Sequence, residues 1–201
     1  MGPKRRDGLM VNIGILVFPQ VEELDFIGPF EVLSYANKLQ DGSVNVRLIA
    51  ATLSPLSAFN GLKFIADTTL SDCPPLDILV VPGGKGRLAA MKDPAIREFI
   101  LRQWQSVRYM TSVCTGAFLL AEAGLLTGKR ATTYHSAFDE LAGYSADVVA
   151  AKVVRDGRLI TAGGVSSGLE LGFYLLKELF GVSFAQTAAE KIEYQVDVAA
   201  L

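Results

Sequence analysis

The sequence contains few of the side chains that bind metals or form crosslinks. Its 201 residues include only two cysteines and one histidine. Two cysteines cannot supply the disulfide framework of a small secreted domain, and a single histidine disfavours a zinc site. We therefore expect a reduced, cytoplasmic setting, with neither a metal nor an organic cofactor.

A strong charge imbalance and long apolar runs are also missing. The formal net charge is −2 and no basic stripe is present, so the sequence gives no support for a nucleic-acid partner. No stretch is long enough to cross a membrane, and none has the layout of a signal peptide. The one basic cluster, Lys4 to Arg6, lies in a polar leader of residues 1–9, which we expect to be flexible.

Apolar residues are abundant, at 50% of the chain, and strand patterns alternate with helix patterns. Buried, β-rich segments separated by helices predict a mostly parallel sheet with helices on both faces. The expected class is α/β, a doubly wound, flavodoxin-like sandwich in one domain of residues 10–201. We expect its main strands at residues 10–18, 44–51, 77–81, 107–113 and 158–161.

Several local signals set the expected boundaries. Pro29 should begin the first helix, after a loop over residues 20–29. Asp93 should cap a helix over residues 94–105, and Asp156-Gly157 should form the turn of a hairpin. The last helix should begin at Ser183 and run to about Val196.

The stretch from Val107 to Gly124 changes from a strand pattern to a helix pattern at Cys114. A side chain at such a junction lies at the carboxyl edge of the sheet and faces the free N–H groups of the helix. Those groups favour negative charge, so we expect a lowered pKa and a nucleophilic thiolate. The alternative is an inert, buried cysteine that serves as a small hydrophobic residue. Cys73, next to two prolines, has no such surroundings and is expected to be inert.

Other candidate groups should meet Cys114 at this edge. Asp25 lies between Leu24 and Phe26, which suggests that its loop folds inward and brings a proton donor to the sulfur; Glu22 and Glu23 should face solvent. Gly83 and Gly84, with Thr115, could direct N–H groups at an anionic intermediate, or could simply form a strand-end turn. His135 is either a catalytic or a structural histidine.

Several motifs together resemble the ThiJ/PfpI superfamily, whose fold is that of class I glutamine amidotransferases. They span residues 11–194 and are Phe18-Pro19 with Leu24-Asp25, Cys73 to Asp77, Val81 to Gly84, Thr111 to Ala117, Gly124 to Thr133, and Val154 to Gly164. The pair Leu24-Asp25 and the segment Ser-Val-Cys-Thr-Gly most resemble the isonitrile hydratases within this superfamily. Where relatives have Thr-Thr-His-Trp, this chain has Thr-Thr-Tyr-His.

The resemblance implies that Cys114 is the nucleophile, that Asp25 is the acid beside it, and that Thr115, Gly83 and Gly84 line the site. It also implies a homodimer and a small-molecule substrate. The expected reaction converts an isonitrile and water into an N-substituted formamide through a covalent Cys114 thioimidate, which makes the protein a lyase. The alternatives are glyoxalase or deglycase activity on 2-oxoaldehydes, amidase or protease activity that uses His135, and a non-catalytic redox sensor based on cysteine oxidation.

Overall fold

The computed structural model describes residues 10–201, and its centre is a seven-stranded sheet in the order β10-β11-β7-β6-β1-β2-β5. Neighbouring strands are parallel except for the β10–β11 hairpin. This confirms the predicted α/β class with a mostly parallel sheet; the leader of residues 1–9 lies outside the described residues. The strands are β1 (Val11–Leu16), β2 (Val44–Ala50), β5 (Thr68–Thr69), β6 (Ile78–Val81), β7 (Tyr109–Val113), β10 (Val153–Asp156) and β11 (Leu159–Ala162).

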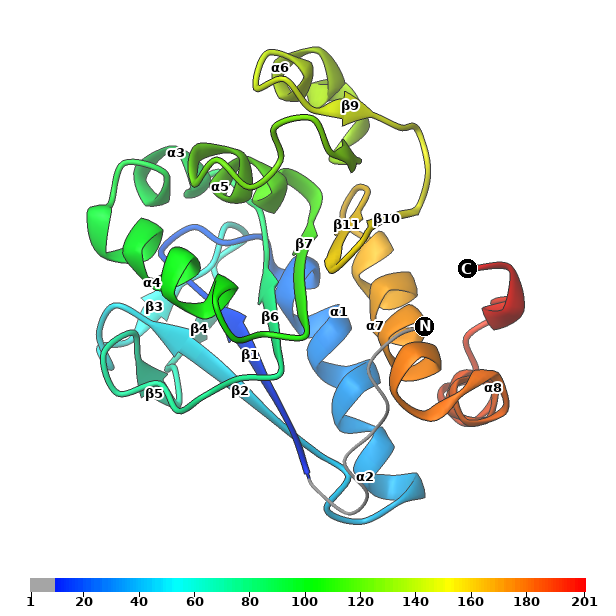
Figure 1. Cartoon of the computed structure of the whole chain (residues 1–201). Coiled ribbons are helices and arrows are strands. Elements are labelled where there is room, and N and C mark those ends of the chain that lie inside the picture. The colour runs from blue at the N-terminus through cyan, green and yellow to red at the C-terminus, as the bar shows by residue number, and fades with distance from the viewer. Residues whose placement is uncertain (1–9) are drawn as a thin grey trace.

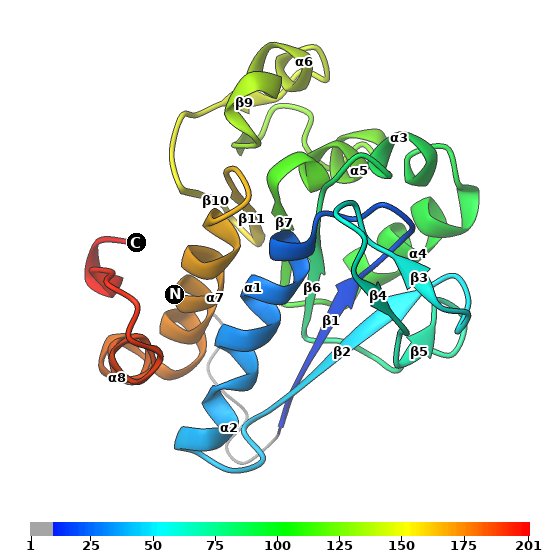
Figure 2. The ribbon, with the colours of Figure 1, turned by 180° about the vertical axis from the view of Figure 1, so that it is seen from behind.

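Helices cover both faces of the sheet (Figure 1). Helices α1 (Glu23–Ser34) and α7 (Ser167–Phe180) lie side by side on one face, while α3 (Arg87–Ala90), α4 (Pro94–Trp104) and α5 (Ala117–Glu122) cover the other. Seen from behind, α8 (Val182–Ile192) packs outside α7, and α6 (Phe138–Ala142) belongs to a segment that projects beyond the sheet (Figure 2). The remaining elements are α2 (Ala36–Leu39), β3 (Leu56–Ser57), β4 (Lys63–Phe64), β8 (Arg130–Ala131), β9 (Asp147–Val148) and the 3₁₀ turns Cys114–Gly116, His135–Ala137 and Val198–Ala200.

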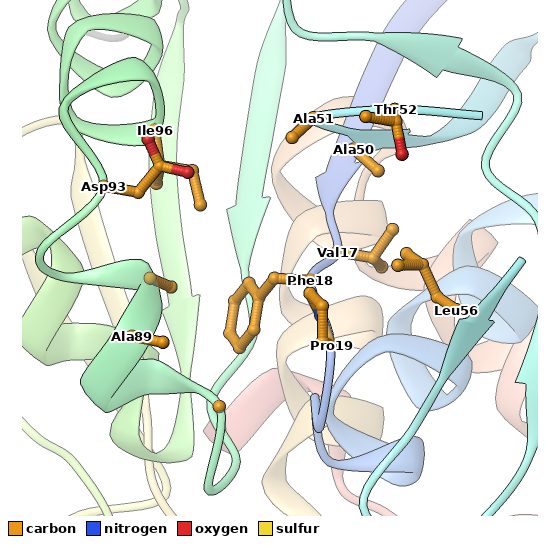
Figure 3. A pocket seen from close by; sticks show the side chains of 12 residues that line it. Val17, Phe18, Pro19, Ala50, Ala51, Thr52, Leu56, Ala89, Asp93 and Ile96 are labelled. Carbon is orange, nitrogen blue, oxygen red and sulfur yellow. The ribbon is translucent and has the colours of Figure 1, made fainter. Parts of the chain in front are cut away.

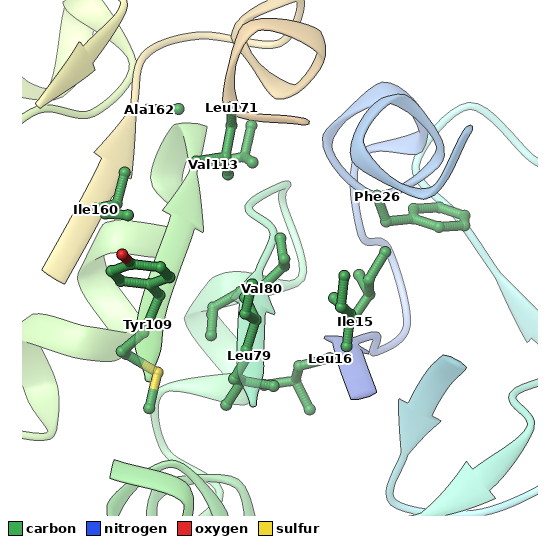
Figure 4. Close-up of a cluster of buried hydrophobic side chains, with 14 of the residues drawn as sticks. Ile15, Leu16, Phe26, Leu79, Val80, Tyr109, Val113, Ile160, Ala162 and Leu171 are labelled. Atoms are coloured by element: carbon green, nitrogen blue, oxygen red, sulfur yellow. The ribbon is translucent and has the colours of Figure 1, made fainter. Parts of the chain in front are cut away.

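The core lies between the sheet and these helix layers. All residues of β6, β7 and β11 are buried, because a central parallel strand is covered on both faces. Leu171 of α7 packs toward the central strands, while the Phe26 ring of α1 points away from them and packs on Phe64 of β4, with ring centroids 4.9 Å apart (Figure 4). Central strands of this kind are rigid, so the loops at their carboxyl ends have a fixed base.

Helix α1 begins earlier than the sequence predicts. It starts at Glu23, and Pro29 lies inside it, so the predicted start at Pro29 is wrong. The helix is held by close packing on α7 rather than by its own sequence: a Cβ atom on Gly172 would lie 2.7 Å from Val32 Cβ, and one on Gly168 would lie 3.0 Å from Pro29 Cδ. The earlier start places Asp25 on the first helical turn instead of in a loop.

Other boundaries follow local chemistry more closely. Asp93 caps α4 by accepting a hydrogen bond from Ala95 N at 2.9 Å, and Asp156-Gly157 forms the turn between β10 and β11, as predicted. Helix α8 differs: it begins at Val182 after Gly181 and ends at Ile192. It stops there because Glu193 adopts a left-handed backbone conformation with φ of 59°. No helix among residues 10–201 is both long and apolar enough to cross a membrane.

Candidate active site

Cys114 occupies the abrupt turn between β7 and α5. Strand β7 ends at Val113, and Cys114 begins a 3₁₀ turn with φ of 55°. This left-handed conformation is unfavourable for a residue other than glycine, and the segments that follow β11 and β8 hold it in place. Cys114 N donates to Gly163 O at 2.8 Å, and Thr133 Oγ1 donates to Cys114 O at 2.8 Å. The predicted elbow is confirmed, and the side chain is 6% exposed.

Asp25 lies beside the sulfur and is fully buried. Its Oδ2 accepts a hydrogen bond from Gly83 N at 2.9 Å. Its Oδ1 is buried without a nitrogen or oxygen partner among the described residues, and the Cys114 thiol is the other polar group that interacts with the carboxyl. A protonated carboxyl group can donate from Oδ1, whereas a carboxylate leaves that oxygen unsatisfied.

Burial favours the protonated form of both groups. Desolvation, together with the charge of Glu22, raises the pKa of Asp25 to about 7 even though the Gly83 N–H bond opposes the shift. Desolvation and the charge of Asp25 likewise raise the pKa of Cys114 to about 12. The predicted lowering of the thiol pKa is therefore wrong in direction. The Thr115 N–H and hydroxyl do favour the thiolate, but they are outweighed by burial and by the carboxylate.

Because each charge destabilises the other, the two groups titrate as a pair rather than independently. With one proton shared between them, a protonated Asp25 removes the negative charge that disfavours the thiolate and can donate to the sulfur. The arrangement therefore suits proton transfer between Asp25 and a group bound to Cys114.

The glycine loop, residues 82–86, links these groups. Gly83 N is occupied by Asp25, and Gly84 N donates to Thr115 Oγ1 at 3.1 Å. The predicted role of both N–H groups as free donors for an anionic intermediate is not what the structure shows. A Cβ atom on Gly83 would lie 2.6 Å from Thr115 N, so glycine is required for the loop to approach the elbow. The loop positions the acid and Thr115.

A cavity of about 440 Å³ opens at Cys114, within the range of small-molecule sites. The side chains of Phe59 and Leu88 lie at its exposed rim, at 45% and 58% exposure. Asp25 lies behind Cys114 and does not line the open space. The lining residues are Glu22, Phe59, Gly84, Lys85, Arg87, Leu88, Cys114, Thr115, Tyr134 and Val165.

The structure does not bring His135 into this cavity. His135 is exposed and lines a neighbouring cavity of about 390 Å³. Tyr134, the preceding residue, lines both cavities and packs against the His135 ring with centroids 4.4 Å apart. Tyr134, which stands where the related motif has histidine, therefore puts a phenol and not an imidazole in the wall of the Cys114 cavity, and a Cys–His–acid triad is not assembled.

Glu22 and Glu23 are partly exposed, in line with the prediction, and they also bind the β3–β4 hairpin. Glu23 Oε1 accepts from Asn60 N at 2.8 Å, and Glu22 Oε1 accepts from Asn60 Nδ2 at 3.3 Å. Phe59 N also donates to Val21 O at 2.9 Å. These contacts fix Phe59 at the rim. Nothing local in the sequence indicates that a hairpin far along the chain receives these carboxylates.

A third cavity, of about 370 Å³, lies on the other side of the glycine loop and α3 (Figure 3). Its walls are mainly apolar, with Phe18 and Pro19 on one side and Ala89 and Ile96 on the other. It contains neither Cys114 nor Asp25. Cys73 is half-buried and lines none of these three cavities. No cluster of three or more His, Cys, Asp or Glu within residues 10–201 could hold a metal ion.

The comparison with protein families agrees with this geometry. Residues 11–178 match the model of the DJ-1/PfpI family. The chain belongs to the DJ-1/PfpI family. This assignment covers the strands, the elbow and the segment that carries Asp25, so the ThiJ/PfpI resemblance is confirmed.

Known DJ-1/PfpI proteins match most of the chain. An isonitrile hydratase from Pseudomonas putida is 44% identical over 186 residues, which cover 92% of this chain and 79% of that protein. The crystal structure of a ThiJ/PfpI family protein from Pseudomonas syringae superposes with a TM-score of 0.85 and 34% identity, covering 94% of this chain and 76% of that one. The crystal structure of Drosophila melanogaster DJ-1beta gives a TM-score of 0.83 at 24% identity, over 94% and 100% of the two chains, and supports the fold.

Proposed function

We propose that this protein hydrates isonitriles, with Cys114 as the nucleophile and Asp25 as the proton carrier. The observation that carries the proposal is the buried pair itself: a strained elbow holds the thiol beside a carboxyl group whose pKa is raised to about 7. The 44% identity to an isonitrile hydratase over most of the chain supports the choice of substrate class. The apolar rim formed by Phe59 and Leu88 suits the organic group on the isonitrile nitrogen.

The proposed reaction begins and ends with one proton on the pair. The Cys114 thiolate attacks the terminal isonitrile carbon, an S–C bond forms, and Asp25 gives its proton to that carbon to produce a thioimidate. The Asp25 carboxylate then accepts a proton from attacking water and passes it to the nitrogen. When the C–S bond breaks, the new hydroxyl returns a proton to Asp25, the thiolate leaves, and an N-substituted formamide is released.

The direct test is turnover of n-butyl isonitrile, followed as N-butylformamide by mass spectrometry. We expect wild type and Cys73→Ser to form the product and Cys114→Ala to form none. Trapping of a thioimidate adduct on the Cys114 peptide would identify the bond that forms. Undiminished turnover by Cys114→Ala would contradict the proposal.

Glyoxalase activity is a second candidate, because a glutathione-independent glyoxalase from Caenorhabditis elegans is 24% identical over 82% of its length. Addition of the Cys114 thiol to an aldehyde would use the same pair. Consumption of methylglyoxal by an enzyme that leaves isonitriles unchanged would favour this alternative. An amidase or protease is less well supported, since His135 does not line the Cys114 cavity.

A further inference from the structure

We propose that Tyr134 is a specificity-determining wall of the Cys114 cavity, and that the Arg87–Glu140 ion pair is a positioning device that holds it there. The inference deepens the proposed function, because it names what limits the size of the group that reaches the sulfur. It rests on a set of contacts outside the Asp25–Cys114 pair.

The Tyr134 ring is fixed on the side nearest the elbow. Thr133, the residue before it, donates its hydroxyl to Cys114 O at 2.8 Å. The ring also packs against Gly164, where a Cβ atom would lie only 2.8 Å from Tyr134 Cδ2. Tyr134 is half-buried and lines the cavity together with Cys114 and Val165. An aromatic ring held in the wall of this cavity restricts the width of the ligand that can reach Cys114.

Arg87 binds the far end of the segment that runs from Tyr134 into α6. Its Nη1 and Nη2 donate to Glu140 Oε1 and Oε2 at 3.0 and 2.8 Å, a bidentate geometry that fixes orientation as well as distance. The Arg87 side chain is only 14% exposed, and its guanidinium lies 4.0 Å from the centre of the Phe118 ring.

These contacts join three helices, each of which follows a part of the site along the chain. Arg87 belongs to α3, which follows the glycine loop; Phe118 belongs to α5, which follows Cys114; and Glu140 belongs to α6, which follows Tyr134. Arg87 therefore ties the projecting segment to α3, whose Arg87 and Leu88 line the cavity, and to α5, which follows the elbow. The ion pair acts together with the hydrogen bond from Ala137 N to Tyr134 O, at 2.8 Å, and with the burial of Leu141 in the core. It is the side-chain contact that ties α6 to α3, so its loss should loosen residues 134–142 without unfolding them.

The test measures access to the sulfur without requiring turnover. In a Cys73→Ser background, Cys114 is the only cysteine, and its alkylation by iodoacetamide, which is small, is compared with that by N-phenylmaleimide, which is bulky. We expect Tyr134→Ala to raise the rate ratio of bulky to small reagent about tenfold, as for the removal of one pocket wall. Tyr134→Phe keeps the ring and should leave the ratio unchanged.

Arg87→Met and Glu140→Gln should shift the same ratio in the same direction as Tyr134→Ala, and should increase amide hydrogen exchange in residues 133–142. The matched control is Glu178→Gln, which removes a carboxylate from another Arg–Glu pair, that with Arg155 at 2.7 Å, outside the cavity. An unchanged ratio in Tyr134→Ala would overturn the role of the ring. A changed ratio in Tyr134→Ala with none in Glu140→Gln would overturn the role of the ion pair.

The same variants separate this inference from the proposed function. If isonitriles are turned over, Tyr134→Ala should lower the KM for cyclohexyl isonitrile relative to n-propyl isonitrile, with little change in kcat for the smaller compound. If no isonitrile is turned over, the alkylation ratios still decide whether Tyr134 and the Arg87–Glu140 ion pair control access to Cys114.

Discussion

At the scale of single residues, the chemistry of the site depends on burial more than on the helix that follows Cys114. The Thr115 N–H favours the thiolate, yet desolvation and the Asp25 charge raise the pKa of Cys114 to about 12. The stronger influence on reactivity is therefore the protonation of Asp25, whose pKa lies near 7. A pair of this kind loses its first proton at a pH set by the carboxyl group.

Replacement of Asp25 by Asn should reveal this coupling. In wild type, the rate of Cys114 alkylation by iodoacetamide should rise through about pH 7, as the pair loses its first proton, and then level off. Asn cannot share a proton with the sulfur, so Asp25→Asn should lose this step and react only as the buried thiol itself ionises at higher pH. Its kcat for an isonitrile should fall by about 10² or more, as expected when a general acid–base group is removed. An alkylation profile that keeps the step near pH 7 in Asp25→Asn would show that another group controls it.

Residue types and motifs were enough to predict part of the site. Cys114 was identified from the change of pattern at a strand end, and Asp25 from a carboxylate flanked by apolar residues. The sign of the thiol pKa shift could not be predicted, because it depends on how deeply tertiary packing buries the sulfur. Nor could the sequence show that the Gly83 and Gly84 N–H groups donate to Asp25 and Thr115 and are therefore not free to bind an anionic intermediate. The sequence also did not indicate that Tyr134 lines the cavity, because the neighbouring His135 was the more recognisable catalytic residue type.

At the scale of elements, contacts between helices override local signals. Asp93 and Pro94 marked the start of α4 correctly, because a cap and a first-turn proline act within one turn. The same proline signal at Pro29 gave the wrong start for α1. That helix extends to Glu23 because its N-terminal turns pack on α7 across Gly28 and Gly168, a contact between segments far apart in the sequence. This longer helix is what carries Asp25 to the sulfur.

The close approach of α1 and α7 can be tested at Gly172. A Cβ atom there would overlap Val32, so Gly172→Ala should lower the free energy of unfolding by about 1–3 kcal/mol. Val32→Ala removes the opposing Cγ1, which would lie 2.8 Å from the new Cβ atom, but keeps the Val32 Cβ at 2.7 Å. It should therefore recover only part of this loss in the double variant, and Val32→Ala alone should also destabilise. Urea unfolding of the four proteins measures the coupling. Additive losses in the double variant would show that the two residues do not compete for the same space.

At the scale of the whole molecule, apolar side chains gather near the opening of the Cys114 cavity. Phe59 and Leu88 form its rim, and Leu62 N interacts with Glu23 at the start of α1. Ile27, one turn further along the same helix, is also exposed, at 39%. Exposed apolar groups in one region are typical of a protein interface. The homodimer implied by the family resemblance stays a prediction, and this region is where we expect its interface.

We expect sedimentation equilibrium to give the mass of a dimer for the full chain. Leu62→Glu places a charge on the exposed apolar region, at a side chain that is 42% exposed, and should shift the equilibrium toward monomer without unfolding the protein. Met10 immediately precedes β1 and is 43% exposed. Met10→Glu therefore provides a control of similar exposure. If the Leu62→Glu variant remains a dimer, the interface lies elsewhere. If the wild type is monomeric, the predicted dimer is excluded.

The backbone of Cys114 has a consequence for how far this protein can be stabilised. A φ of 55° suits glycine better than any residue with a side chain, and the mismatch costs on the order of 1 kcal/mol. A glycine at this position would relax the turn but would abolish the thiol. Selection for heat resistance alone would therefore tend to favour an inert protein, and variants recovered from such a screen need an assay of thiol reactivity before they are accepted.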